Sequence, residues 1–196
     1  MSRDNDLPFA VGSTYGATSA SDGAQFEGRE YTVDDVNPAT GARRSNKRRR
    51  LRVVRNTSGG ALLPKRLVTF KATAGSASVG QVDGMACVTA ARAYPIDEYL
   101  PAAGCANNDL CYIVVEGPAV CYTAAASLSA ISVGSEVVAA TAATSGAATA
   151  GRVNLISLTG ATSPLADQIR NRIGYAMSAV TASNIDSDLA VDVGRW

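Results

Sequence analysis

Residues 110–122, Leu-Cys-Tyr-Ile-Val-Val-Glu-Gly-Pro-Ala-Val-Cys-Tyr, decide the fold class of this chain. They form the densest run of β-branched and aromatic residues in the sequence, and such residues favour β-strands. Gly117-Pro118 interrupts the run once, and a Gly-Pro breaker is typical of a tight turn. We therefore expect two short strands that are joined at Gly117-Pro118 as a hairpin.

Further strand candidates lie on both sides of this hairpin, with turn residues between them. They cover 51–55, 65–73, 85–91, 131–139, 152–158, 173–180 and 189–193. Residues 75–80 and 94–108 are expected as turn and loop, and a short helical turn is expected only at 164–171. Because helix-length periodic segments are missing between the strands, the sequence predicts an all-β fold, a small antiparallel β-barrel or sandwich. The expected core residues are Val68, Phe70, Ile113, Val115, Val137, Ile156 and Val191.

The first third of the chain has a different composition. Residues 1–46 contain fewer apolar side chains than the rest and keep neither a strand period nor a helix period. We expect an extended N-terminal arm over 1–55 that needs a partner to become ordered. The β-rich domain should then span 56–196 and stay folded when the arm is removed.

Charge is unevenly distributed although the net charge is only +1. Residues 1–36 carry seven acids against two arginines, whereas residues 43–55 carry eight cations and no acid. Such a basic run binds an acidic protein surface or nucleic-acid phosphates, or is simply solvated. Stacking aromatics are absent from 43–55, so we place an acidic protein partner before nucleic acid. The candidate partner-binding residues are Arg43, Arg44, Lys47, Arg48, Arg49 and Arg50.

The residues for catalysis or metal binding are missing from the sequence. It contains no histidine, which removes the commonest general base and the commonest zinc ligand. The acid pairs Asp34-Asp35, Asp97-Glu98 and Asp186/Asp188 are expected as solvated loop acids. We therefore expect no enzymatic activity, no metal and no cofactor.

The four cysteines are Cys87, Cys105, Cys111 and Cys121, and they form no Cys-x-x-Cys pair. In a hairpin centred on Gly117-Pro118, Cys121 lies opposite Val114 and shares a face with Tyr112, whereas Cys111 faces the other way, which argues against a disulfide between these two cysteines. We expect buried, free thiols in a protein made in the cytoplasm. The polar N-terminus is unlike a signal peptide, and no run of about 20 apolar residues predicts a membrane span.

Several pieces of the chain, in order, resemble the head decoration (cementing) proteins of tailed bacteriophages. They are residues 109–118, residues 131–139, the Ala/Gly-rich loop to Gly151, residues 173–180 and the closing 190–196, with 68–70 as a further piece. The resemblance implies a β-rich domain on the outside of a capsid, where it bridges and stabilises the major capsid protein. It also implies a virion location for the protein. A homotrimer with 1–55 as its attachment arm would bind repeated capsid sites together. A nucleic-acid-binding module, or another virion part such as a head–tail joining or fibre-base protein, remains an alternative.

Overall fold

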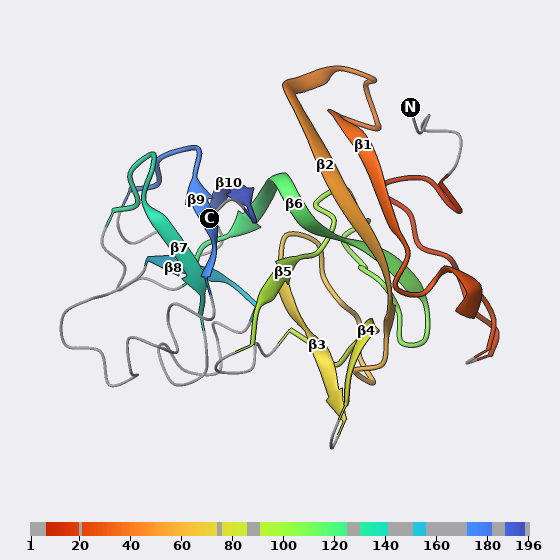
Figure 1. Cartoon of the computed structure of the whole chain (residues 1–196). Helices are drawn as coiled ribbons and strands as arrows, with labels where there is room; N and C mark the ends of the chain where they lie inside the picture. Colours follow the sequence, from red (N-terminus) through yellow and green to blue (C-terminus); the bar gives the residue numbers. More distant parts are fainter. Residues whose placement is uncertain are drawn as a thin grey trace.

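Figure 1 presents a computed structural model of the chain, which describes residues 7–19, 21–73, 76–85, 91–124, 130–140, 151–155, 172–181 and 187–194. Strands dominate these residues. They contain no α-helix, and a single 3₁₀ turn lies at Ala24–Phe26. The predicted all-β fold class is confirmed.

In the described part of the chain, ten strands form one large sheet. They are β1 (Glu30–Val36), β2 (Arg43–Asn56), β3 (Leu67–Thr73), β4 (Ser76–Val82), β5 (Ala93–Pro95), β6 (Leu110–Tyr122), β7 (Glu136–Ala139), β8 (Val153–Leu155), β9 (Arg172–Ala176) and β10 (Asp188–Val193). The strand order is β5-β3-β4-β2-β6-β10-β9-β7-β8, and β1 pairs with β2 beside this path. The pairing of β2 with β4 is parallel, and the ends of the path, β5 and β8, are not paired with each other. The sheet is therefore mixed and open, where the sequence predicted an antiparallel arrangement.

Strand β6 joins the two halves of the sheet, and in Figure 1 it runs between β1–β5 on one side and β7–β10 on the other. Its first half pairs with β2 as far as Glu116, and its second half pairs with β10 from Gly117 onward. The hairpin expected at Gly117-Pro118 is therefore wrong, because Leu110–Tyr122 is one continuous strand. Gly117 adopts a φ of 93° at the point where the strand changes partner. The breaker marks a change of pairing partner, not a reversal of the chain.

Both faces of the β2–β6 pair are buried, which explains the unbroken apolar run in β6. On one face, Leu51, Tyr112 and Val114 belong to a large apolar cluster that continues into β7–β10. On the other face, Val54 and Ile113 belong to a small apolar cluster that also takes in β3 and β4. The core prediction is confirmed for Val68, Ile113, Val115, Val137 and Val191, while Phe70 is partly buried and Ile156 lies outside the described residues.

Residues 30–55 are integral to the sheet, which corrects the expected arm over 1–55. Strand β1 pairs with β2 over most of its length, and β2 pairs with β6 on its other edge. Leu51, Val53 and Val54 of β2 are fully buried. The expected boundary at residue 55 thus falls inside a central strand, and deleting 1–55 would remove β1 and nearly all of β2.

The segment before β1 packs on the large apolar cluster. The ring of Phe9 stacks on Tyr112 with centroids 4.4 Å apart, and the Tyr112 hydroxyl donates to the Phe9 carbonyl at 2.9 Å. Tyr15 forms a backbone bridge with Leu110. A few aromatic contacts, which leave no period in the sequence, order this part of the expected arm.

The remaining expectations have mixed outcomes. Strands β3, β7 and β8 fall within the predicted strand segments and are shorter than predicted, whereas β9 and β10 overlap theirs but begin one residue earlier. Strand β4 occupies the expected turn at 75–80, and β5 occupies the start of the expected loop at 94–108. Residues 86–90 and 164–171 lie outside the described residues.

Candidate functional site: the basic strand and the buried ion cluster

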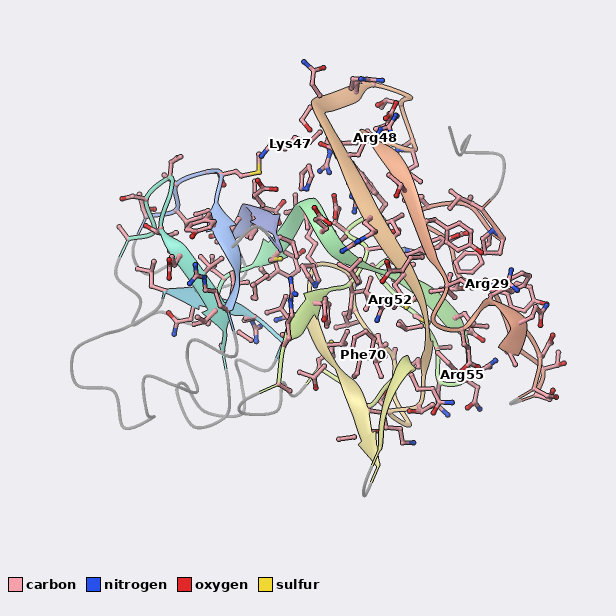
Figure 2. All side chains as sticks on the ribbon, viewed as in Figure 1. Arg29, Lys47, Arg48, Arg52, Arg55 and Phe70 are labelled. Carbon is pink, nitrogen blue, oxygen red and sulfur yellow. The ribbon has the colours of Figure 1, made fainter. Side chains whose placement is uncertain are left out.

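The basic run occupies the first half of β2 and therefore alternates between two faces. Arg48 and Arg50 point to solvent with side chains 65% and 49% exposed, whereas Arg49 between them is 1% exposed. Figure 2 shows Arg48, Arg52 and Arg55 in sequence along β2. A single run of like charges thus becomes one exposed group and one buried group.

Every one of the eight cations in 43–55 lies beside a carboxylate of the same chain. On the exposed face, Arg43 Nη2 contacts Asp34 Oδ2 at 2.7 Å, and Arg50 Nη2 contacts Glu116 Oε2 at 3.1 Å. Lys47 Nζ reaches Asp192 Oδ2 of β10 at 2.6 Å. The other pairs are Arg44–Asp35, Arg44–Glu98, Arg48–Asp34, Arg49–Asp97, Arg49–Glu98, Arg50–Glu30, Arg52–Glu30 and Arg55–Glu27.

The antiparallel register of β1 and β2 explains most of this pairing. Glu30 lies opposite Arg52, and Asp34 lies opposite Arg48. Opposite charges on directly facing positions stabilise a strand pair, so the acidic and basic blocks hold each other. The sequence predicted that the basic run would meet an acidic surface on a partner. Instead, the charge of the basic run is largely compensated inside the chain, which weakens the case for binding of nucleic-acid phosphates.

A buried ion cluster, defined here as Arg44, Arg49, Asp35, Asp97 and Glu98, lies behind the exposed face, and of its members Arg44 keeps 28% of its side chain exposed. Arg49 Nη2 is 2.9 Å from Glu98 Oε2 and 3.7 Å from Asp97 Oδ1. Arg44 Nη2 is 2.8 Å from Glu98 Oε1, and Arg44 Nε donates to Asp35 Oδ1 at 3.0 Å. The cluster thereby ties β1 and β2 to the loop after β5.

Neighbouring groups complete the cluster. The Gly12 amide donates to Asp97 Oδ2 at 2.7 Å, which brings the N-terminal segment to the same point. The Tyr99 ring lies under both guanidinium groups, with Cζ of Arg44 5.3 Å and Cζ of Arg49 5.6 Å from its centroid. Cation–π contacts of this kind are strongest where the cation is desolvated. Four segments that are distant in the sequence therefore meet at one set of charges.

The sequence misassigned the acids of this cluster. Asp34-Asp35 and Asp97-Glu98 were expected as solvated loop acids, but Asp35 is 1% exposed and Asp97 is fully buried. Asp34 is half exposed and pairs with Arg43 and Arg48. An available signal was the apolar sequence Tyr94-Pro95-Ile96 immediately before Asp97-Glu98. Buried carboxylates need cationic partners, and the arginine-rich run was the obvious source.

The pKa of Glu98 is raised above its ordinary value. Burial is the main cause, and the attraction of Arg49 and Arg44 opposes it without cancelling it. The charge count of the cluster agrees, since three carboxylates face two guanidinium groups. One proton on Glu98 would make the cluster neutral.

This raised pKa predicts a pH dependence of stability. A proton binds Glu98 more tightly in the folded chain than in the unfolded chain, so its contribution is complete below the unfolded pKa and is lost as pH rises through the folded pKa. We expect Glu98→Gln, which cannot ionise, to lack this decline. The measurement is the urea midpoint of both proteins across the range above pH 4.5, the ordinary value for this carboxyl. The assignment would be refuted if the urea midpoints of the two proteins changed in parallel with pH, or if the midpoint of Glu98→Gln fell more steeply than that of wild type.

A cavity of about 250 Å³ adjoins the cluster. It lies between the N-terminal segment and the β1–β2 hairpin, and Arg49 forms part of its wall. The remaining lining is mostly apolar: Leu7, Ala10, Val11, Val33, Val36 and Pro38, with Asp34. The cavity combines one guanidinium and one carboxylate with aliphatic walls and offers no nucleophile.

Three of the cysteines can be placed. Cys105, Cys111 and Cys121 are buried and free, as expected, and Cys87 lies outside the described residues. Cys121 shares the large apolar cluster with Tyr112, whereas Cys111 belongs to the small one. The predicted separation of Cys111 and Cys121 onto opposite faces is confirmed, although the hairpin used to argue for it is not.

Within the described part of the chain, no group of histidine, cysteine or acidic side chains has the arrangement of a metal site. The same residues include no helix long and apolar enough to cross a membrane. No protein-family model matches the chain, and no curated protein is significantly similar to it.

Proposed function

We propose that this chain is a structural virion protein that binds the outside of a tailed-phage capsid and stabilises the shell. In this proposal it has no catalytic role, is made in the host cytoplasm and becomes part of the capsid surface. Its partner is the major capsid protein, and it acts as a homotrimer whose copies bind together.

The observation that carries the proposal is the arrangement of the segments that resemble the decoration proteins. These segments contain β7 and most of β6, β9 and β10, and the four strands are consecutive in the sheet order β6-β10-β9-β7. Apolar residues of all four strands belong to the large cluster, while Cys111, Ile113 and Val115 of β6 belong to the small one. Pieces scattered over the sequence therefore form one folded unit, as a shared domain would.

The exposed face of the β1–β2 hairpin supports the choice of an acidic protein partner. Arg43, Arg48 and Arg50 keep 55%, 65% and 49% of their side chains exposed despite their ion pairs. Exposed pairs are worth only ~0.2–1 kcal/mol each, so these guanidinium groups can exchange an internal carboxylate for one on a partner. Arg44 and Arg49 belong to the buried cluster and have a structural role instead.

The test is co-sedimentation with heads of the phage that encodes the chain, prepared without this protein. Wild type should bind, and the triple variant Arg43→Gln/Arg48→Gln/Arg50→Gln should bind roughly tenfold more weakly, with a smaller loss on added salt. Arg29→Gln, which removes an exposed cation just before β1, is the matched control. A deletion of 1–55 is unsuitable because it would remove β1 and most of the central strand.

The outcomes separate the alternatives. Absence of wild-type binding to heads would overturn the proposal, and equal binding by the triple variant would move the contact away from the basic strand. A salt-dependent mobility shift with DNA or RNA that the triple variant loses would favour the nucleic-acid alternative. Light scattering on the purified chain tests the trimer separately.

A further inference from the structure

The cavity of about 250 Å³ beside the buried ion cluster has a residue with an unsatisfied hydrogen-bond donor in its wall. This residue is Arg49, and Val33 of β1 lies directly opposite it, so both side chains stand on the same face of the β1–β2 hairpin. Arg49 Nη2 pairs with Glu98 and Asp97, but its buried Nε–H donates to no group in the described part of the chain. Since buried donors are nearly always hydrogen-bonded, this N–H needs an acceptor that the described chain does not supply.

The opposite wall of the cavity is fixed by hydrogen bonds. It contains Ala10 and Val11 of the N-terminal segment. On one side of these residues the Phe9 carbonyl accepts a hydrogen bond of 2.9 Å, and on the other side the Gly12 amide donates one of 2.7 Å. Both bonds join this segment to residues far along the sequence, so the two walls are held apart by the fold itself.

The size and lining of the cavity indicate what fits inside it. Pockets for small molecules usually measure roughly 300–1,000 Å³, so this one is small for a metabolite but suits a single aliphatic side chain. Its walls are mostly aliphatic, from Leu7, Val11, Val33 and Val36 among others. A neutral acceptor suits the Arg49 Nε–H better than an anion, because the cluster already has three carboxylates for two guanidinium groups. A peptide offers both groups, an apolar side chain and a backbone carbonyl beside it.

Two features next to the cavity favour an extended, acidic peptide. Strand β1 contributes residues to the lining and pairs with β2 on one edge, and the described part of the chain places no strand on its other edge. Such an edge can hydrogen-bond to an added extended segment. Asp34, which lines the cavity, contacts Arg43 Nη2 at 2.7 Å and Arg48 Nε at 3.6 Å. Two exposed guanidinium groups therefore stand beside the cavity, where acidic side chains of the peptide can pair with them.

We propose that this cavity is a docking pocket for one aliphatic side chain, such as leucine, from an extended acidic segment of a partner protein. The backbone carbonyl beside that side chain accepts from the Arg49 Nε–H, and the acidic neighbours pair with Arg43 and Arg48. The inference rests on the proposed function only for the identity of this partner, the major capsid protein. The pocket adds a buried apolar anchor to exposed ion pairs that bind weakly by themselves.

The test uses the full-length chain and a fluorescein-labelled peptide that carries one leucine between glutamates and is blocked at both ends. Fluorescence anisotropy should show saturable binding. The affinity should fall roughly tenfold when alanine replaces the leucine, and also when lysines replace the glutamates. In an isotope-edited NMR spectrum, the Arg49 Nε–H resonance should shift when the leucine peptide is added.

A variant with a filled cavity tests the location of the contact. Ala10→Leu adds an aliphatic side chain to an exposed residue of the lining and should weaken peptide binding roughly tenfold. Ala39→Leu is the matched control, because it adds the same side chain at an exposed position of the β1–β2 turn that does not line the cavity. It should bind the peptide as wild type does. Circular dichroism and the Tm show that both variants are folded.

Four results would overturn the proposal. They are an absence of saturable binding, equal affinity for the leucine and alanine peptides, an Arg49 Nε–H resonance that stays unchanged at saturation, and equal binding by Ala10→Leu and wild type. Self-association that Ala10→Leu abolishes, without peptide binding, would assign the pocket to a second copy of the chain and would also overturn it. Heads that bind the wild-type chain while the peptide does not would leave the proposed function standing. Peptide binding without head binding would overturn the capsid proposal alone.

Discussion

Replacing Arg49 by alanine should lower the free energy of unfolding by about 3–5 kcal/mol, the usual cost of removing one partner of a buried ion pair. The Arg49 side chain is 1% exposed, and its Nη2 lies 2.9 Å from Glu98 Oε2 and 3.7 Å from Asp97 Oδ1. Without it, Arg44 alone would face three buried carboxylates. The urea midpoint and the Tm of the full-length variant measure this loss.

The neighbouring Arg48 provides the control. It belongs to the same run, but its side chain is 65% exposed and its contact with Asp34 is 3.6 Å long. Arg48→Ala should therefore change stability by less than about 1 kcal/mol. Equal losses in the two variants would show that the buried cluster does not stabilise the fold.

A double variant separates the missing charge from the missing packing. Adding Glu98→Gln to Arg49→Ala removes one of the three carboxylates that Arg44 alone would face, so we expect it to recover part of the lost stability. Full additivity of the two substitutions would mean that Arg49 acts through its packing alone. Recovered stability in the double variant would show that Arg49 and Glu98 are coupled through their ion pair.

The second large effect is expected at Gly117, where Gly117→Ala should cost roughly 2–5 kcal/mol. Two physical effects contribute to this loss of stability. The φ of 93° is unfavourable for any residue with a side chain, and a Cβ atom would stand 2.3 Å from the Arg48 carbonyl oxygen and 3.2 Å from Arg49 Cα. A substitution would therefore push β2 and β6 apart where β6 changes its pairing partner.

Gly134→Ala separates these two terms. Gly134 has a similar φ of 85°, but a Cβ there would meet nothing within 4 Å. It should cost only the conformational term of about 1–2 kcal/mol. If both variants lost the same stability, the close approach of β6 to Arg48 would not matter.

The sequence alone was sufficient for the fold class and for much of the core. Runs such as Leu110–Val115 are too rich in β-branched and aromatic residues for another local structure. These properties depend on neighbouring residues. The predictions of the fold class and of these core residues therefore hold, even though the hairpin prediction for the same stretch is wrong.

Only the tertiary structure decided which strands pair and which charges meet. Gly117-Pro118 is compatible with a turn or with a strand that changes partner, and the choice depends on β10, which lies about 70 residues further along the chain. Asp97 and Glu98 become buried because β2 brings Arg49 beside them. The acidic and basic blocks bind each other because the β1–β2 register sets Asp34 opposite Arg48. Strand register and the burial of a charge are set by contacts between distant segments, whose partners local sequence does not specify.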